Sequence, residues 1–412
     1  MSPTGRLLVA VAFATVLFVP GVLWLTGFQG EEIENRDLTQ APAFDSPADV
    51  FDTDTYEQAS AYVVDQLPLR SALVEANAKL NLEVFDESPN PAVTLGADGW
   101  LFLTEALDNV CEPVVPPDEV AARMNRLAGI VAGSGRELVL TIAPDKNAIY
   151  PEHLGKGERS EPEGGDQGGE GERSEPGGGD QWGEGDAAEK GACADETRSE
   201  LRERLDAVTP PGYVDAYAAM EGIADAADRP VYYPHDTHWT TRGLASFVEQ
   251  IVEALQPGLW DPEALTIREE PHTGDLTRLL GMPSELETQR TFVDRPGVAT
   301  PGLEGDERLR PPSTGEIVTQ APEGTPRLPG RTLVIFDSFF DNAIGMLAPY
   351  TTELTFVRWG QFDETRFAEL VRDHDVIVIE SAERNAYEKY GAELGSEAQA
   401  RALLDVLGAA GS

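Results

Sequence analysis

This sequence of 412 residues has few cysteines, histidines and basic residues. It contains two cysteines, five histidines and only 31 basic residues against 73 acidic ones. The formal net charge of -42 argues against nucleic acids and anionic membrane surfaces as partners through non-specific attraction. No cysteine pair has zinc-ligand spacing, and no glycine-rich loop resembles a phosphate-binding loop. We therefore expect no metal and no cofactor.

The two cysteines, Cys111 and Cys193, are too few to form a disulfide framework. They are either two unrelated buried thiols or a single disulfide in an exported domain. The sequence leaves both alternatives open.

The amino-terminal stretch 7–30 contains no charged residue and consists mostly of Leu, Val, Ala and Phe. Its length matches the ~20 residues that cross the hydrocarbon core of a bilayer. Arg6 precedes it, which favours an amino terminus inside the cell. We therefore predict a single-pass membrane anchor at residues 1–30, with an extracytoplasmic domain at residues 31–412. A cleaved signal peptide is the alternative, although the apolar run is longer than usual and lacks an Ala-x-Ala exit.

A low-complexity stretch interrupts this domain. The sequence Gly-Glu-Arg-Ser-Glu-Pro begins at residue 157 and again at residue 171, in a segment rich in Gly, Glu and Asp. So few apolar side chains cannot offset the entropy cost of ordering the chain. We predict a disordered acidic insertion at residues 156–191.

The remaining sequence alternates between strand and helix patterns. Strands are predicted at residues 138–143, 333–336, 354–357 and 376–379, and helices lie between and after the last three. This alternation is typical of βαβ units, so we expect an α/β fold with a parallel sheet flanked by helices. Residues 257–329 are rich in proline and are predicted to be irregular.

Three residues could support nucleophilic chemistry. Asp236 stands two residues before His238, and Ser338 follows a predicted buried strand. A serine hydroxyl needs a base to remove its proton, and the base is usually a histidine held by a carboxylate. The alternatives from spacing alone are a structural Asp-x-His loop and a serine that caps a helix.

A series of motifs strengthens the catalytic interpretation. They are Glu-Asn-Arg-Asp-Leu at 34–38, Asp-Gln-Leu-Pro-Leu-Arg at 65–70, Gly-Ala-Asp-Gly-Trp-Leu-Phe at 96–102, Ala-Pro-Asp-Lys at 143–146, Asp-Thr-His-Trp at 236–239, Gly-Asp-Leu at 274–276 and Asp-Ser-Phe at 337–339. In this order the chain resembles the AlgX/AlgJ family of SGNH-hydrolase-like polysaccharide O-acetyltransferases. Common SGNH esterases have the Ser block first and the Asp/His block last.

The resemblance implies an SGNH-hydrolase-like domain in which Ser338 is the nucleophile, His238 the general base and Asp236 its orienting carboxylate. Phe336 departs from the family pattern, because SGNH enzymes and some members of this family have Gly there. Four further residues are predicted to contact substrate: Lys146, Tyr150, Trp239 and Arg384.

The implied activity is acetyl transfer to hydroxyls of a surface or cell-wall polysaccharide, at the cell membrane and outside the cytoplasm. Acetyl-CoA is not expected there, so the implied donor is a multi-spanning membrane-bound O-acyltransferase. Two alternatives stay open. One is an acetyl esterase on the same triad, with water as the acceptor. The other is a non-catalytic glycan-binding subunit.

Overall fold

The computed structural model describes residues 3–27, 39–43, 53–66, 70–85, 87–154, 184–282, 285–308 and 310–410. The chain divides into two compact units. The first consists of Met1–Val93 with Thr273–Glu285, and the second of Thr94–His272 with Leu286–Ser412.

The first unit is helical. Its helices are α1 (Pro3–Leu25), α2 (Thr53–Asp65), α3 (Arg70–Leu80) followed by a π-helical turn (Asn81–Phe85), and α10 (Asp275–Leu279). The backbone N–H and the hydroxyl of Thr39 both donate to Asp65 Oδ2, at 3.0 and 2.6 Å. Among the described residues, no helix has both the length and the apolar character needed to cross a membrane. The anchor predicted for residues 1–30 stays a prediction.

The second unit is built on a six-stranded sheet in the order β4-β3-β10-β8-β9-β7. Its strands are β3 (Glu137–Ala143), β4 (Tyr213–Val214), β7 (Thr314–Val318), β8 (Leu328–Phe336), β9 (Thr351–Arg358) and β10 (Val376–Ala382). All neighbours are parallel except β7, which pairs antiparallel with β9. The predicted strands are confirmed, but the sheet is mixed rather than fully parallel, because β7 arises from the stretch expected to be irregular.

The central strands are buried on both faces, which explains their continuous apolar sequences. Val139, Val334 and Val378 lie in one hydrophobic cluster. Their neighbours along the strands, such as Leu140 and Ile335, lie in the other cluster. Side chains alternate across a strand, so each central strand contributes to two cores.

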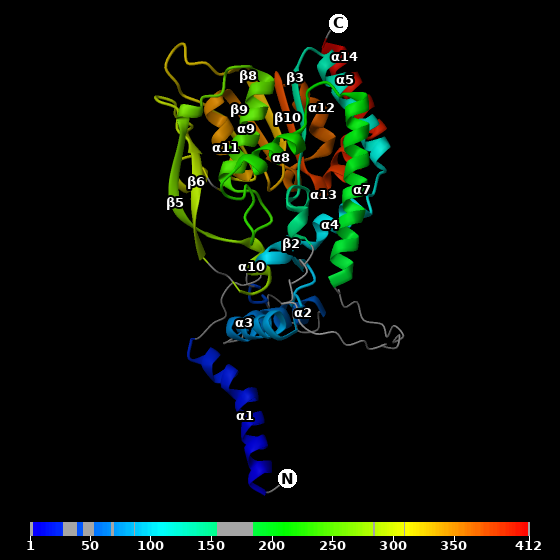
Figure 1. The fold of residues 1–412 in the computed structure, drawn as a ribbon. Coiled ribbons are helices and arrows are strands. Elements are labelled where there is room, and N and C mark those ends of the chain that lie inside the picture. Colours follow the sequence, from blue (N-terminus) through cyan, green and yellow to red (C-terminus); the bar gives the residue numbers. More distant parts are fainter. Residues whose placement is uncertain are drawn as a thin grey trace, which may run out of the picture. The chain divides into compact units, whose positions relative to one another are not determined.

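Helices cover both faces of the sheet (Figure 1). On the Val139 side lie α8 (Ala216–Ala226), α9 (Thr241–Leu255) and α11 (Asp341–Leu347). On the opposite side lie α5 (Pro117–Gly133), α7 (Glu184–Val208), α12 (Phe367–Arg372) and α14 (Glu397–Ala410). This three-layer arrangement is an α/β fold with a mixed sheet flanked by helices.

Smaller elements complete the unit. They are β1 (Val93–Leu95), β2 (Leu101–Leu103), α4 (Thr104–Cys111), α6 (Lys146–Ile149) and α13 (Glu383–Ala386). A two-stranded sheet of β5 (Leu265–Thr273) and β6 (Glu285–Val293) also falls within the stretch predicted to be irregular. That prediction was wrong because period and composition missed three strands bounded by prolines.

The insertion predicted to be disordered at 156–191 is shorter than expected at its carboxyl end. Helix α7 begins at Glu184, and residues 155–183 lie outside the described part of the chain. Lys190 forms an ion pair with Asp108 of α4. Three residues further on, Cys193 is joined to Cys111 in a disulfide with a Cα–Cα distance of 5.1 Å. These contacts order the start of α7 despite its weak apolar pattern.

The disulfide closes a loop of 82 residues, so its loss should lower stability through the entropy gained by the unfolded chain. We expect the double variant Cys111→Ala/Cys193→Ala to lose about 2–5 kcal/mol in free energy of unfolding, measured by urea titration. Reduction of the disulfide in the native chain should lower the midpoint of urea unfolding to a similar extent. An unchanged midpoint on reduction would contradict this prediction.

Candidate active site

Functional segments gather where β3, β8 and β10 end. β3 ends at Ala143 and β8 at Phe336, and the parallel β10 lies between them and ends at Ala382. The carboxyl ends of parallel strands meet at one edge of a sheet, which is where α/β proteins place their sites. The Asp-Ser-Phe motif follows β8 directly at this edge.

The loop that carries Asp236 and His238 is held by a buried lysine. Lys146, at the start of α6, donates to the backbone carbonyls of Tyr233, Pro234 and Asp236 at 3.1, 3.0 and 2.7 Å. An ammonium group has three donors, and a buried charge must be compensated by such contacts. Lys146 therefore fixes the shape of this loop.

The Gly-Ala-Asp-Gly-Trp-Leu-Phe motif supports the same loop from another direction. The N–H of Leu101 donates to the carbonyl of Pro234 at 2.9 Å. Gly96 has no room for a side chain, since a Cβ there would lie 2.3 Å from the carbonyl oxygen of His153. Trp100 is buried and stacks on the His153 ring at 4.3 Å. The motif thus builds the site and does not expose an aromatic ring to sugar.

Asp236 and His238 form the contact that the sequence predicted. Nδ1 of His238 lies 2.8 Å from Asp236 Oδ1, and the same oxygen accepts the backbone N–H of His238 at 2.8 Å. Asp236 is buried, whereas the His238 side chain is 29% exposed. Burial tends to raise the pKa of Asp236, but the hydrogen bonds from His238 and His272 outweigh it and hold the pKa well below its usual value. Asp236 is therefore a carboxylate that can hold the His238 ring.

A second histidine binds the other oxygen of this carboxylate. His272 Nε2 lies 3.0 Å from Asp236 Oδ2, and its Nδ1 lies 3.2 Å from Arg290 Nη2. Sequence reasoning left His272 unassigned, because nothing in its neighbourhood marks a partner 36 residues away. The sequence offers only one weak sign of its role: His272 and, further on, Arg290 are able to form hydrogen bonds and lie in the same stretch, which was expected to be irregular.

Ser338 lies in a tight turn that Asp337 fixes. The carboxylate of Asp337 accepts the backbone N–H of Phe339 at 3.0 Å and that of Ala382 at 2.7 Å, which joins the turn to the end of β10. Ser338 itself is half-buried. Helix α11 starts at Asp341, so Ser338 precedes the helix by one turn instead of opening it.

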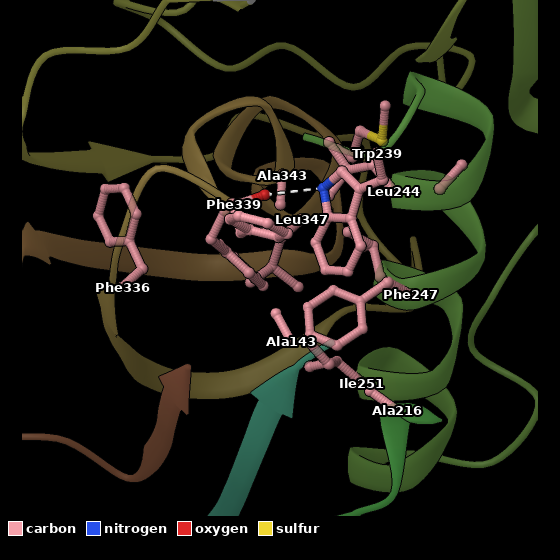
Figure 2. Packing of buried hydrophobic residues seen from close by; sticks show 14 of the residues in the cluster. Ala143, Ala216, Trp239, Leu244, Phe247, Ile251, Phe336, Phe339, Ala343 and Leu347 are labelled. Atoms are coloured by element: carbon pink, nitrogen blue, oxygen red, sulfur yellow. Dashed lines mark hydrogen bonds between the residues drawn. The ribbon is translucent and has the colours of Figure 1, made fainter. Parts of the chain in front are cut away.

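The histidine loop and the serine turn are joined directly. The indole N–H of Trp239 donates to the carbonyl of Phe339 at 2.9 Å, and the dashed line in Figure 2 marks this bond. The Phe339 ring lies 5.1 Å from the His238 ring, centroid to centroid. His238 is therefore next to the residue that follows Ser338.

Below the turn lies a buried network of charges. Arg384 pairs with Asp145, and its guanidinium lies 5.0 Å from the centroid of Phe339. Glu383 pairs with Arg198 of α7 at 2.5 Å and accepts the backbone N–H of Asp145 at 3.3 Å. Burial raises the pKa of both Asp145 and Glu383, although the arginines oppose it. Two acids and two bases thus compensate each other at the carboxyl ends of β3 and β10.

The four residues predicted to contact substrate have internal partners instead. Each is at most 9% exposed: Lys146, Tyr150, Trp239 and Arg384. The Tyr150 hydroxyl, for example, accepts the backbone N–H of Val231 at 2.9 Å. Their burial favours a role in holding the site over direct contact with a sugar.

Two more carboxyl groups surround the turn. Glu380 of β10 is fully buried and accepts the backbone N–H of Asp337 at 3.0 Å. Burial, followed by the nearby Asp337 charge, raises its pKa well above the usual value. Asp341 lies 3.4 Å from Arg358, and burial raises its pKa to about 6, despite the opposing charges of Arg358 and His238. Neither was found from the sequence.

The chain is similar to proteins that are described as acetyltransferases or acetylases. Residues 93–166 match a family model described as "SGNH hydrolase-like domain, acetyltransferase AlgX". A "Probable alginate O-acetylase AlgJ" from Pseudomonas syringae pv. tomato is 23% identical over 250 residues, which cover 57% of this chain and 55% of that protein. The protein of the same name from Pseudomonas aeruginosa is 24% identical over 287 residues, covering 64% and 62%. The chain thus spans little more than half the length of these relatives.

Among solved structures, the O-acetyltransferase domain of Pseudomonas putida AlgJ aligns with a TM-score of 0.41 at 19% identity, covering 73% of this chain and 93% of that one. Bacillus cereus PatB1 aligns with a TM-score of 0.43 at 13% identity, covering 71% and 96%. The family model and the curated relatives confirm the resemblance to the AlgX/AlgJ family that the motifs predicted.

The hydrogen bond from the Trp239 indole to the Phe339 carbonyl should contribute to stability. In Trp239→Phe, the Phe339 carbonyl loses its buried donor while a ring remains, so we expect a loss of about 1–3 kcal/mol in free energy of unfolding by urea titration. Trp260→Phe is the matched control, because this buried indole N–H has no hydrogen-bond partner among the described residues. Equal losses in the two variants would contradict a specific role for the bond.

Asp341 should make stability depend on pH. Because its folded pKa of about 6 exceeds the unfolded value of 3.8, the folded state binds the proton more tightly, and stability falls as pH rises from about 4 to 6. Asp341→Asn should remove a fall on the order of 1–3 kcal/mol, measured by urea titrations at pH 4, 5, 6 and 7. Asp405→Asn, at an exposed position of α14, should leave the pH profile unchanged. Burial also raises the pKa of Glu380, Asp145 and Glu383, so part of the fall should remain in Asp341→Asn. A fall between pH 4 and 6 as large as that of the native chain would contradict the assignment.

Proposed function

We propose that this AlgX/AlgJ-like chain is a polysaccharide O-acetyltransferase that uses Asp236, His238 and Ser338 as a catalytic triad. One observation carries the proposal: His238 is bonded through Nδ1 to a buried carboxylate, and its ring lies against Phe339, the residue after Ser338. With Nδ1–H donated to Asp236, the other ring nitrogen is the one that accepts a proton.

In the first step, the Ser338 oxygen attacks the carbonyl carbon of the acetyl donor, and its proton passes to His238 Nε2. The bond to the leaving group breaks, and the leaving group takes that proton. In the second step, a sugar hydroxyl gives its proton to His238 and attacks the acetyl-serine. The ester bond to Ser338 breaks, the acetylated sugar leaves, and Ser338 recovers the proton.

The similarity to proteins described as "Probable alginate O-acetylase AlgJ" supports a polysaccharide as the acceptor. We propose a hydroxyl of a surface or cell-wall polysaccharide, with acetyl groups delivered by a multi-spanning membrane-bound O-acyltransferase. The disulfide between Cys111 and Cys193 supports a location outside the cytoplasm, because such bonds persist in oxidising compartments.

The nucleophile can be tested directly. Ser338→Ala should abolish acetyl transfer from an activated acetyl ester to an oligosaccharide and prevent labelling by a serine-reactive phosphonate, both followed by mass spectrometry. Ser134→Ala is the control, since Ser134 lies before β3 at the opposite edge of the sheet and should change neither readout. Full labelling of Ser338→Ala would rule out Ser338 as the nucleophile. Acetate release without acetylated sugar would identify an esterase instead.

A further inference from the structure

His272 occupies an unusual position for a residue outside the predicted triad. It lies near the end of β5, its side chain is 18% exposed, and its ring stacks on Tyr233 at 4.2 Å between centroids. Tyr233 belongs to the same loop as Asp236, whose carboxylate His272 also contacts. The ring is thus fixed both by stacking and by a hydrogen bond.

Arg290, which contacts the His272 ring on the side away from Asp236, determines which ring nitrogen of His272 carries the proton. A guanidinium can only donate, so the contact from Arg290 Nη2 requires an unprotonated Nδ1 on His272. The proton of the neutral ring is then on Nε2, which faces Asp236 Oδ2 at 3.0 Å. His272 is therefore a neutral donor to the carboxylate, and its tautomer is set from β6.

The hairpin that supplies both residues is itself attached beside the histidine loop. The N–H of Thr291 on β6 donates to the hydroxyl of Thr241 at 2.8 Å, and Thr241 is the first residue of α9. Arg290 is the residue before Thr291, and it is also within 3.5 Å of Glu270 on β5. The contact between Arg290 and His272 therefore belongs to a structured part of the hairpin.

From this geometry we propose that His272 is a positioning residue, which, oriented by Arg290, holds the second oxygen of Asp236 so that the first one faces His238. The inference rests on the proposed function for its effect on the reaction. Donors on one oxygen alone leave a carboxylate more freedom to rotate about its Cβ–Cγ bond, whereas donors on both oxygens fix its plane. Misplacement of a catalytic group by about 1 Å can cost on the order of a hundred-fold in rate.

The tautomer is tested without any activity assay. In the full-length chain labelled with ¹⁵N-histidine, long-range ¹H–¹⁵N spectra at neutral pH should show His272 protonated at Nε2 and unprotonated at Nδ1, with the assignment taken from His272→Gln. An Nδ1–H tautomer or a doubly protonated ring would overturn the proposal. This outcome is independent of whether the chain transfers acetyl groups.

Two variants then test positioning. His272→Phe keeps the stacked ring but loses the donor, so kcat for acetyl transfer should fall about ten- to a hundred-fold with little change in KM. The His238 Nδ1–H proton resonance should weaken at the same time. His272→Gln places an amide N–H where Nε2 stood, so it should restore the resonance and bring kcat to within about three-fold of the native value.

The outcomes separate the two proposals. A native kcat and an unchanged His238 Nδ1–H resonance in His272→Phe would overturn the positioning role. Failure of His272→Gln to restore kcat or the His238 resonance would overturn it as well. Inactivity of the native chain, with the resonance still dependent on His272, would refute only the proposed function. Thermal unfolding of both variants identifies any loss of fold, and the tautomer of the native chain decides the proposal in that case.

Discussion

The hydrogen bond from the Trp239 indole to the Phe339 carbonyl is the contact on which the site depends. It joins two loops that are a hundred residues apart in sequence and that carry the two halves of the proposed triad. Figure 2 shows that the two rings also pack into the core beside Phe247 of α9. The groups of the proposed triad are therefore placed by a buried polar contact inside an apolar cluster, where an unmade bond would be costly.

Each loop has its own buried charge. Lys146 fixes the histidine loop through three carbonyls, and Arg384 lies under the serine turn, paired with Asp145. Lys146 and Asp145 are adjacent in sequence, so the segment after β3 supports both loops at once. Buried ion pairs rarely add much stability, because desolvation offsets their attraction. In this site the buried charges of Lys146 and Arg384 fix geometry, because they bind their partners only when the histidine loop and the serine turn are correctly placed.

The sequence predicted those parts of the molecule that are encoded locally. Continuous apolar runs identified the central strands, and Asp236 with His238 was found because the two residues lie in one short motif. His272, Glu380 and Asp341 were not found, since their contacts depend on how distant strands and turns meet. The four residues expected to touch sugar were recognised as part of the site, but sequence does not reveal that their side chains face inward.

The hairpin of β5 and β6 is another part of the site that the sequence did not predict. Its prolines and weak alternation suggested irregular structure, yet it supplies His272, which contacts the carboxylate of Asp236, and Arg290, which contacts His272. The acidic excess of the chain, by contrast, has little bearing on the site. The buried charges below the serine turn are balanced, two acids against two arginines, because unpaired charges are expensive to bury. The net charge of -42 must therefore lie mainly outside this network, where solvent and salt screen it.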